Sequence, residues 1–248
     1  MLASRALLVG ELDFAYEEIH RAISAAGSSD PDEPPHHVPL VLVPVVAAVV
    51  AAVRGDADEA RVHTRRRAPA WLSERVAVDP TAQVALAFNR ALIEGLLGSP
   101  TGVLEELAAV DLTDSCGFIS QQVATCEVLA GWARACAGDA SGIPNAFGGM
   151  AQIEDGPELV LRSALRTFLG HALLEMDDER AVGALAQARL EGESRGELWW
   201  MPETIRLQAL AERRFGDGAR SAALLDEAEA LATRVGAGVV LPRIAASR

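Results

Sequence analysis

Three cysteines are the first residues in this 248-residue chain whose chemistry and spacing call for an explanation. Cys116, Cys126 and Cys136 recur every ten residues, and on a helix such a step rotates each side chain by about 80° from the previous one. The thiols therefore do not converge as metal ligands. An odd number of cysteines also fits a reducing cytoplasm better than a disulfide framework. We expect buried small side chains.

The histidines give no stronger signal for catalysis or metal binding. His20, His63 and His171 stand singly on predicted helices, and we expect each to be a surface or packing residue rather than a ligand or base. His36 and His37 are adjacent in a proline-rich stretch, where solvated side chains are a better interpretation than a metal site. No G-x-S-x-G context appears, and all 22 basic residues are arginine, which excludes a P-loop lysine or a Schiff base. The sequence predicts no catalytic residue, no cofactor and no metal site.

One cluster near the C-terminus is a candidate for partner binding: Trp199, Trp200, Glu203 and Arg206. Neighbouring side chains on a helix point about 100° apart, so one tryptophan can enter the core while the other faces a groove. An exposed tryptophan there would suit a protein partner, although packing is the favoured interpretation of both. Glu203 and Arg206 are three residues apart, and we expect them to pair with each other.

The elements that must position these residues follow a repeat of roughly 40 residues. A glycine followed by an acidic or small polar residue ends one apolar stretch after another, with Met176-Asp177 standing in once for the glycine pair. The other pairs are Gly10-Glu11, Gly55-Asp56, Gly98-Ser99, Gly138-Asp139 and Gly216-Asp217. Glycine just after one helix and a capping residue before the next are typical of a tight turn between two helices.

Side chains at fixed distances from these turns predict how the helices pack. Seven residues before the turn the residue is small in most units: Ala3, Ala48, Ala91, Gly131, Leu169 and Ala209. Five and nine residues after the turn, small and then large apolar residues prevail, as in Ala15 with Ile19 and Ala181 with Leu185. This is one face of a helix, so each unit reads as a helical hairpin that buries its apolar face against the next hairpin.

Two units depart from this pattern. Thr64 and Arg67 interrupt the apolar face in the second, and Pro144 with Gly148-Gly149 interrupts the second helix of the fourth. We expect a short or irregular helix in both places. Residues 27–37, rich in proline, serine and acidic residues, are predicted to be a mobile loop.

At these distances the chain resembles a tetratricopeptide-type repeat array. Its last unit, GELWWMPETIRLQALAERRFGDGARSAALLDEAEALATRVGA, resembles the C-terminal repeats of large bacterial LuxR-type transcriptional regulators and related ATP-binding (STAND-like) proteins. In that family a W-x-P-E-x-x-R-L helix, a Gly-Asp turn and an alanine-rich helix recur. The matching residues here are Trp200, Pro202, Glu203, Arg206 and Leu207, with the turn at Gly216-Asp217.

The resemblance implies an all-α fold: a right-handed α-solenoid of about six tetratricopeptide-like (TPR-like) hairpins forming a single domain over residues 1–248. Such regulators also carry an N-terminal ATPase domain and a C-terminal helix-turn-helix, and neither pattern is present here. We therefore expect a truncated or split member of that group. Its uncapped ends are predicted to permit self-association.

A hydrophobic stretch and the charge of the chain bear on where such a protein works. Val38 to Val53 is too short to span a membrane, for which about 20 residues are needed, so we expect a buried first helix of the second hairpin, starting near Pro44. Net charge is −13, which argues against direct nucleic-acid binding. Arg65–Arg66–Arg67 is a local exception, predicted to be a solvated helix end. We expect a cytoplasmic protein.

Three functional hypotheses remain open. The first is a non-catalytic scaffold or sensor module in bacterial signalling or transcription regulation, which binds a protein or peptide partner or a small effector. The second is a fragment of a LuxR-type regulator that acts on DNA through a missing or partner DNA-binding domain. The third, an enzyme, has no set of residues to which roles can be assigned.

Overall fold

The computed structural model describes residues 2–26, 39–65, 80–110, 120–156 and 161–248. Every regular element in these ranges is an α-helix, and no strand occurs in them, so the predicted all-α class is confirmed. The helices are α1 (Leu2–Leu8), α2 (Leu12–Ala26), α3 (Pro39–Arg54), α4 (Ala57–Arg65), α6 (Pro80–Leu97), α7 (Pro100–Ala108), α8 (Ser120–Cys136), α9 (Gly142–Asp155), α10 (Arg162–Glu175), α11 (Arg180–Arg195), α12 (Met201–Phe215), α13 (Gly218–Val235) and α14 (Leu241–Ser247). The predicted mobile loop at 27–37, with His36 and His37, lies outside the described residues, as do Cys116, Arg66 and Arg67.

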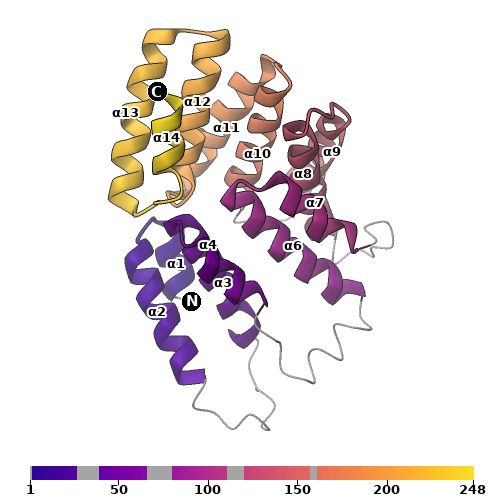
Figure 1. Cartoon of the computed structure of the whole chain (residues 1–248), viewed down its shortest axis with the longest axis vertical. Coiled ribbons are helices and arrows are strands. Elements are labelled where there is room, and N and C mark those ends of the chain that lie inside the picture. Colours follow the sequence, from indigo (N-terminus) through magenta and orange to yellow (C-terminus); the bar gives the residue numbers. More distant parts are fainter. Residues whose placement is uncertain (1, 27–38, 66–79, 111–119, 157–160) are drawn as a thin grey trace.

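Consecutive helices pack as pairs, and each pair packs on the next (Figure 1). The paired helices are α1 with α2, α3 with α4, α6 with α7, α8 with α9, α10 with α11, and α12 with α13. The first helices of neighbouring pairs also touch one another: α3 contacts α6, α6 contacts α8, α8 contacts α10, and α10 contacts α12. One continuous apolar core contains buried residues from all six of these pairs.

The turns within the pairs fall where the sequence places them. Four turn glycines have left-handed backbones, with φ of +79°, +95°, +77° and +82° at Gly10, Gly55, Gly98 and Gly138 respectively. In the fifth pair Asp177 takes the same conformation with φ of 58°, which aspartate tolerates better than most side chains do. Gly216 in the sixth pair has φ of −135°, and there Asp217 caps α13 by accepting a hydrogen bond from the Ala219 amide at 2.8 Å.

The small residues predicted at the helix crossings are buried. Ala48, Ala91 and Ala209 are inaccessible to solvent, as are Ala15 and Ala60 on the second helices. These side chains let the backbones of paired helices approach closely, which is the packing that the repeat pattern predicts.

The fourth pair departs from the pattern by one residue. Phe147 occupies the expected large apolar position but is 36% exposed, while its neighbour Ala146 is fully buried. The shift arises because α8 and α9 meet at glycines: a Cβ on Gly142 would lie 2.3 Å from the Gly131 carbonyl oxygen. The closest approach of the two helices therefore determines which face of α9 is buried.

The expected interruption of α9 is wrong, because the helix runs unbroken from Gly142 to Asp155. Pro144 lies in its first turn, where a backbone amide needs no partner within the helix. Gly149 is buried, and a Cβ there would lie 2.4 Å from the Ala124 carbonyl oxygen. The glycine that weakens α9 as an isolated helix is what lets it pack against α8. In the second pair, α4 is described from Ala57 to Arg65, and Arg67 lies outside the described residues.

The hydrophobic stretch forms α3, which starts earlier than predicted. It begins at Pro39 and includes Pro44 as an interior residue, because proline suits the first position of a helix and burial outweighs the single backbone hydrogen bond that Pro44 removes. Residues 47–53 are at most 5% exposed, so the predicted burial is confirmed. Among the described helices, none has the length and apolar character needed to cross a bilayer.

The C-terminal segment returns to the start of the array (Figure 1). The Val239 amide donates to the Val53 carbonyl at 3.1 Å, and the Leu198 amide donates to the Leu8 carbonyl at 2.7 Å. Gly238 fits tightly here, since a Cβ on it would lie 2.2 Å from the carbonyl oxygen of Arg54. The segments that precede α12 and α14 therefore contact the first two pairs, and the chain closes on itself through backbone contacts.

Candidate functional site: a pocket lined by the first helices

A pocket of about 250 Å³ opens where the first helices of four successive pairs meet α14. Its lining comes from the end of α6, from α8, α10 and α12, and from Arg243 of α14. The residues that carry the chemistry are Trp132, Phe168, His171, Trp200, Glu203 and Arg206. The residues on its walls lie about one repeat apart in the sequence and come from separate helices.

The wall of the pocket is aromatic. The rings of Trp132 and Phe168 meet edge to face with centroids 5.0 Å apart, and Phe168 stacks on Trp200 at 6.3 Å. All three are buried residues of the main core. Such a wall presents flat apolar surface to a ligand at little cost in side-chain entropy, because its rings are held by packing.

A buried ion pair forms the charged side of the pocket. The Arg206 guanidinium donates to both oxygens of Glu203, at 2.8 and 2.9 Å, and Arg243 donates to Glu203 Oε1 at 3.1 Å. Burial alone would raise the pKa of Glu203, but the charge and hydrogen bonds of Arg206, together with the charge of Arg243, outweigh it and lower the pKa to about 2. Glu203 therefore stays ionised and cannot act as a general acid near neutral pH.

His171 connects Trp132 of the aromatic wall to Glu175 at the pocket mouth. Trp132 Nε1 donates to His171 Nδ1 at 3.0 Å, and because an indole N–H can only donate, Nδ1 must carry the lone pair. The proton of the neutral ring is then on Nε2, which lies 3.3 Å from the Glu175 carboxylate. The hydrogen bond from His171 lowers the pKa of Glu175, against the effect of burial. The group presents a fixed donor and a carboxylate at the pocket mouth.

A second hollow, of about 360 Å³, shares His171 and Glu175 with the first. Its other lining residues are Leu174, Leu210, Arg213 and Arg214. Arg214 donates to the Leu174 carbonyl at 2.9 Å and pairs with Asp177. The two hollows are adjacent, because His171 and Glu175 line both of them.

Of the two cysteines in the described residues, Cys136 lines the pocket. Burial, together with the nearby Glu175 carboxylate, raises the pKa of its thiol to about 12. The thiol is therefore protonated at neutral pH and is a weak nucleophile. Cys126 is buried, as predicted, and Cys136 is half-buried; both are free thiols.

The structure brings together three of the four candidate residues from the sequence. Trp200, Glu203 and Arg206 line the pocket, and the expected Glu203–Arg206 pair is confirmed. Trp199 is 1% exposed and is not among the lining residues, so it packs behind the site. Packing also dominates Trp200, which is 3% exposed.

Sequence reasoning missed Trp132, Phe168, His171 and Arg243. A signal for two of them existed: Trp132 and His171 precede the left-handed residues of their turns, Gly138 and Asp177, by the same number of positions. Equivalent positions on successive first helices face the same side, so this register could have paired them. Arg243 carries no such signal, since it reaches the site only because the C-terminal segment folds back.

Comparison of the chain with protein-family models, with curated proteins and with solved structures found no match. The case for a function therefore rests on the geometry of the pocket and on the repeat pattern.

Proposed function

We propose that this protein is a non-catalytic helical-repeat module, a scaffold or sensor in bacterial signalling or transcription regulation, which binds a peptide segment of a partner protein in the pocket between its first helices. The observation that carries the proposal is the lining itself. Four successive first helices and α14 contribute to one hollow that combines an aromatic wall with fixed polar groups, the make-up of binding pockets in general.

The architecture supports the proposal. We take the six helix pairs to be TPR-like hairpins of a right-handed α-solenoid that forms one domain, in which the first helices line the concave face. Small residues at the crossings, left-handed residues at the turns and the W-x-P-E-x-x-R-L resemblance all favour this interpretation. A solenoid binds extended ligands along such a face and can transmit binding by small changes in curvature.

The lining indicates the chemistry of the ligand. The first hollow suits an apolar or aromatic side chain, which would lie against Trp132, Phe168 and Trp200. In the second hollow Arg213 and Arg214 favour an acidic side chain or a main-chain carbonyl on the neighbouring residue. The His171–Glu175 pair, which lines both hollows, offers a donor and an acceptor to the peptide backbone. A small effector with an aromatic ring and an acidic group would satisfy the same contacts.

An array of short peptides that scans aromatic–acidic pairs tests this proposal. The purified chain should retain peptides with an aromatic residue next to Asp or Glu, and Cys136→Phe, which fills the first hollow, should abolish retention. His20→Asn lies far from the pocket on α2 and serves as the matched control, with retention unchanged. Equal retention by Cys136→Phe would remove the pocket from consideration as the binding site.

The LuxR resemblance supports a variant of the same proposal: the chain is the repeat region of a regulator that acts through a separate DNA-binding domain. The net charge of −13 leads us to expect no direct binding of nucleic acid. A mobility-shift assay with duplex DNA at low salt checks this. Salt-sensitive binding by the isolated chain would contradict the scaffold proposal and favour direct action on DNA.

A further inference from the structure

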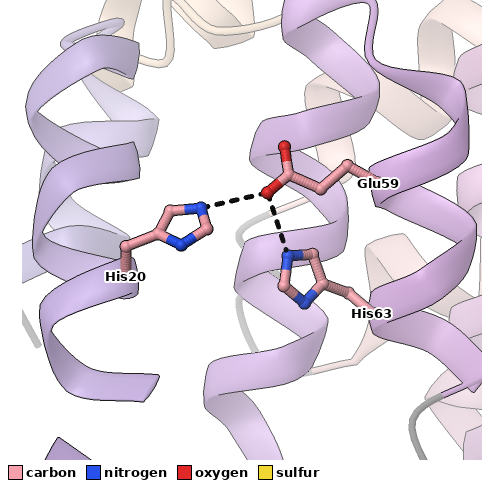
Figure 2. A group of neighbouring side chains, drawn as sticks. All are labelled: His20, Glu59 and His63. Carbon is pink, nitrogen blue, oxygen red and sulfur yellow. Dashed lines mark ion pairs between the residues drawn. The ribbon is translucent and has the colours of Figure 1, made fainter. Parts of the chain in front are cut away.

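Two histidines that are far apart in the sequence meet at one carboxylate in the N-terminal half (Figure 2). His20 comes from α2, while Glu59 and His63 lie one turn apart on α4 and face the same side. His20 Nε2 lies 3.0 Å from Glu59 Oε1, and His63 Nε2 lies 3.4 Å from the same oxygen. All three potential ligand atoms are within 4.8 Å of one another.

These separations are close to those of ligands around a metal ion. Bonds of about 2.0–2.1 Å to a tetrahedral Zn²⁺ place neighbouring ligand atoms about 3.3–3.4 Å apart. The two nitrogen–oxygen distances already lie near that value. The third separation joins the ligand nitrogens of His20 and His63 and is within 4.8 Å. A small rotation of the His20 side chain would shorten this distance toward the value for a tetrahedral ion.

A simple hydrogen bond does not account for His20. Its Nε2 is buried and makes no hydrogen bond within the described part of the chain, although it lies 3.0 Å from the carboxylate oxygen. The two atoms are thus adjacent without the alignment of donor and acceptor. Two ligands directed at a common ion have this arrangement.

The surroundings hold the three side chains in place. Tyr16 donates from its hydroxyl to Glu59 Oε1 at 3.2 Å and packs its ring on His20, with centroids 4.2 Å apart. His63 is 5% exposed, whereas the His20 side chain is 40% exposed. The site is therefore supported by a second layer of contacts and can be reached from solvent on one side.

We propose that His20, Glu59 and His63 bind one divalent first-row transition ion, with Zn²⁺ as the ion best suited to two imidazoles and a carboxylate. The bound ion joins α2 of the first pair to α4 of the second, across an interface in which α1 and α2 also contact α3. It stabilises the N-terminal half of the array, whose first and second pairs also contact the C-terminal segment. This site is independent of the peptide pocket.

Zinc titration of the full chain, followed by calorimetry, tests the proposal. His36→Ala/His37→Ala forms the background, so that those two histidines cannot supply the signal. We expect one Zn²⁺ per chain, a rise in melting temperature on zinc addition, and affinity at least about tenfold weaker in His20→Asn and in Glu59→Gln. Both changes are at partly exposed positions, and circular dichroism confirms that the variants fold. Co²⁺ in place of zinc should give the intense visible absorption of a four-coordinate site.

His171→Gln is the matched control, because His171 and Glu175 form another histidine–glutamate pair one turn apart on a helix but belong to no such group of three among the residues that the structure describes. Its zinc affinity should equal that of the background chain. The proposal is overturned if His20→Asn and Glu59→Gln bind zinc as tightly as the background chain does. Absence of saturable binding in the background chain overturns it as well and leaves Glu59 as an ion-pair partner of the two histidines.

Discussion

Arg243 donates from Nη2 to the backbone carbonyl of Leu96 at 2.7 Å, although 147 positions separate the two residues in the chain. The same guanidinium reaches Glu203 through Nη1 at 3.1 Å. One side chain of α14 thereby joins the end of α6 to α12 and forms part of the pocket wall. Closure of the array and the shape of the site depend on the same contact.

Arg243→Ala should lower the free energy of unfolding by about 1.5–3 kcal/mol, the range for hydrogen bonds to charged groups. The Leu96 carbonyl loses its side-chain donor, and α14 loses its link to Glu203. Urea denaturation measures the change. Arg234→Ala, at an exposed position on α13, is the control and should stay within about 0.5 kcal/mol of the unmodified chain; equal effects of the two changes would argue against a role for Arg243 in closure.

Protonation of Glu203 should lower the free energy of unfolding at acidic pH. Its pKa is lowered from 4.5 to about 2 in the folded chain, so its stabilising contribution is fully present above about pH 4.5 and is lost as the pH falls toward 2. Glu203→Gln should remove that part of the acid dependence in denaturation curves recorded across this range.

Near neutral pH, Glu203→Gln should cost about 3–5 kcal/mol, because it leaves Arg206 buried without a counter-charge. Glu203→Gln combined with Arg206→Met should recover part of that loss, since the buried charge of Arg206 is then removed as well. A double variant less stable than Glu203→Gln alone would show that the cost has another origin.

Two adjacent glycines of α9 should respond to alanine in opposite directions. Gly148→Ala meets nothing within 4 Å and should raise stability by about 0.5–1 kcal/mol through helix propensity. Gly149→Ala would place a Cβ 2.4 Å from the Ala124 carbonyl oxygen and should lower stability by about 1–3 kcal/mol, the usual cost of overpacking. Thermal unfolding monitored by circular dichroism distinguishes the two, and a loss of stability in Gly148→Ala would contradict this account.

The His171 ring should carry a proton on Nε2 and a lone pair on Nδ1, because Nδ1 accepts a hydrogen bond from Trp132 Nε1 at 3.0 Å. Nitrogen-15 chemical shifts of the labelled ring report the tautomer directly. Trp132→Phe removes the donor and should let the other tautomer appear. A proton found on Nδ1 in the unmodified chain would contradict the hydrogen bond and the donor role that we give to Nε2 at the pocket mouth.

The repeat pattern carried most of the information about local structure. Glycine has a low steric cost at positive φ, and this is why Gly10, Gly55, Gly98 and Gly138 mark turns that could be located in advance. Alanine at Ala48 and Ala91 likewise predicted close helix crossings, because a small side chain is what such a crossing requires. The pairing of Glu203 with Arg206 followed from their spacing on one helix.

Long-range contacts were beyond the reach of the pattern. The regularity of α9 was missed because propensity describes an isolated helix, whereas the close approach of Ala124 to Gly149 makes glycine favourable there. Spacing along one helix could not reveal that His20 meets Glu59 and His63, since the contact depends on how α2 packs beside α4. The sequence by itself determined the helices and their turns through local sterics. Only the tertiary structure decided the pocket and the histidine cluster, because both depend on where helices distant in the chain come to rest against one another.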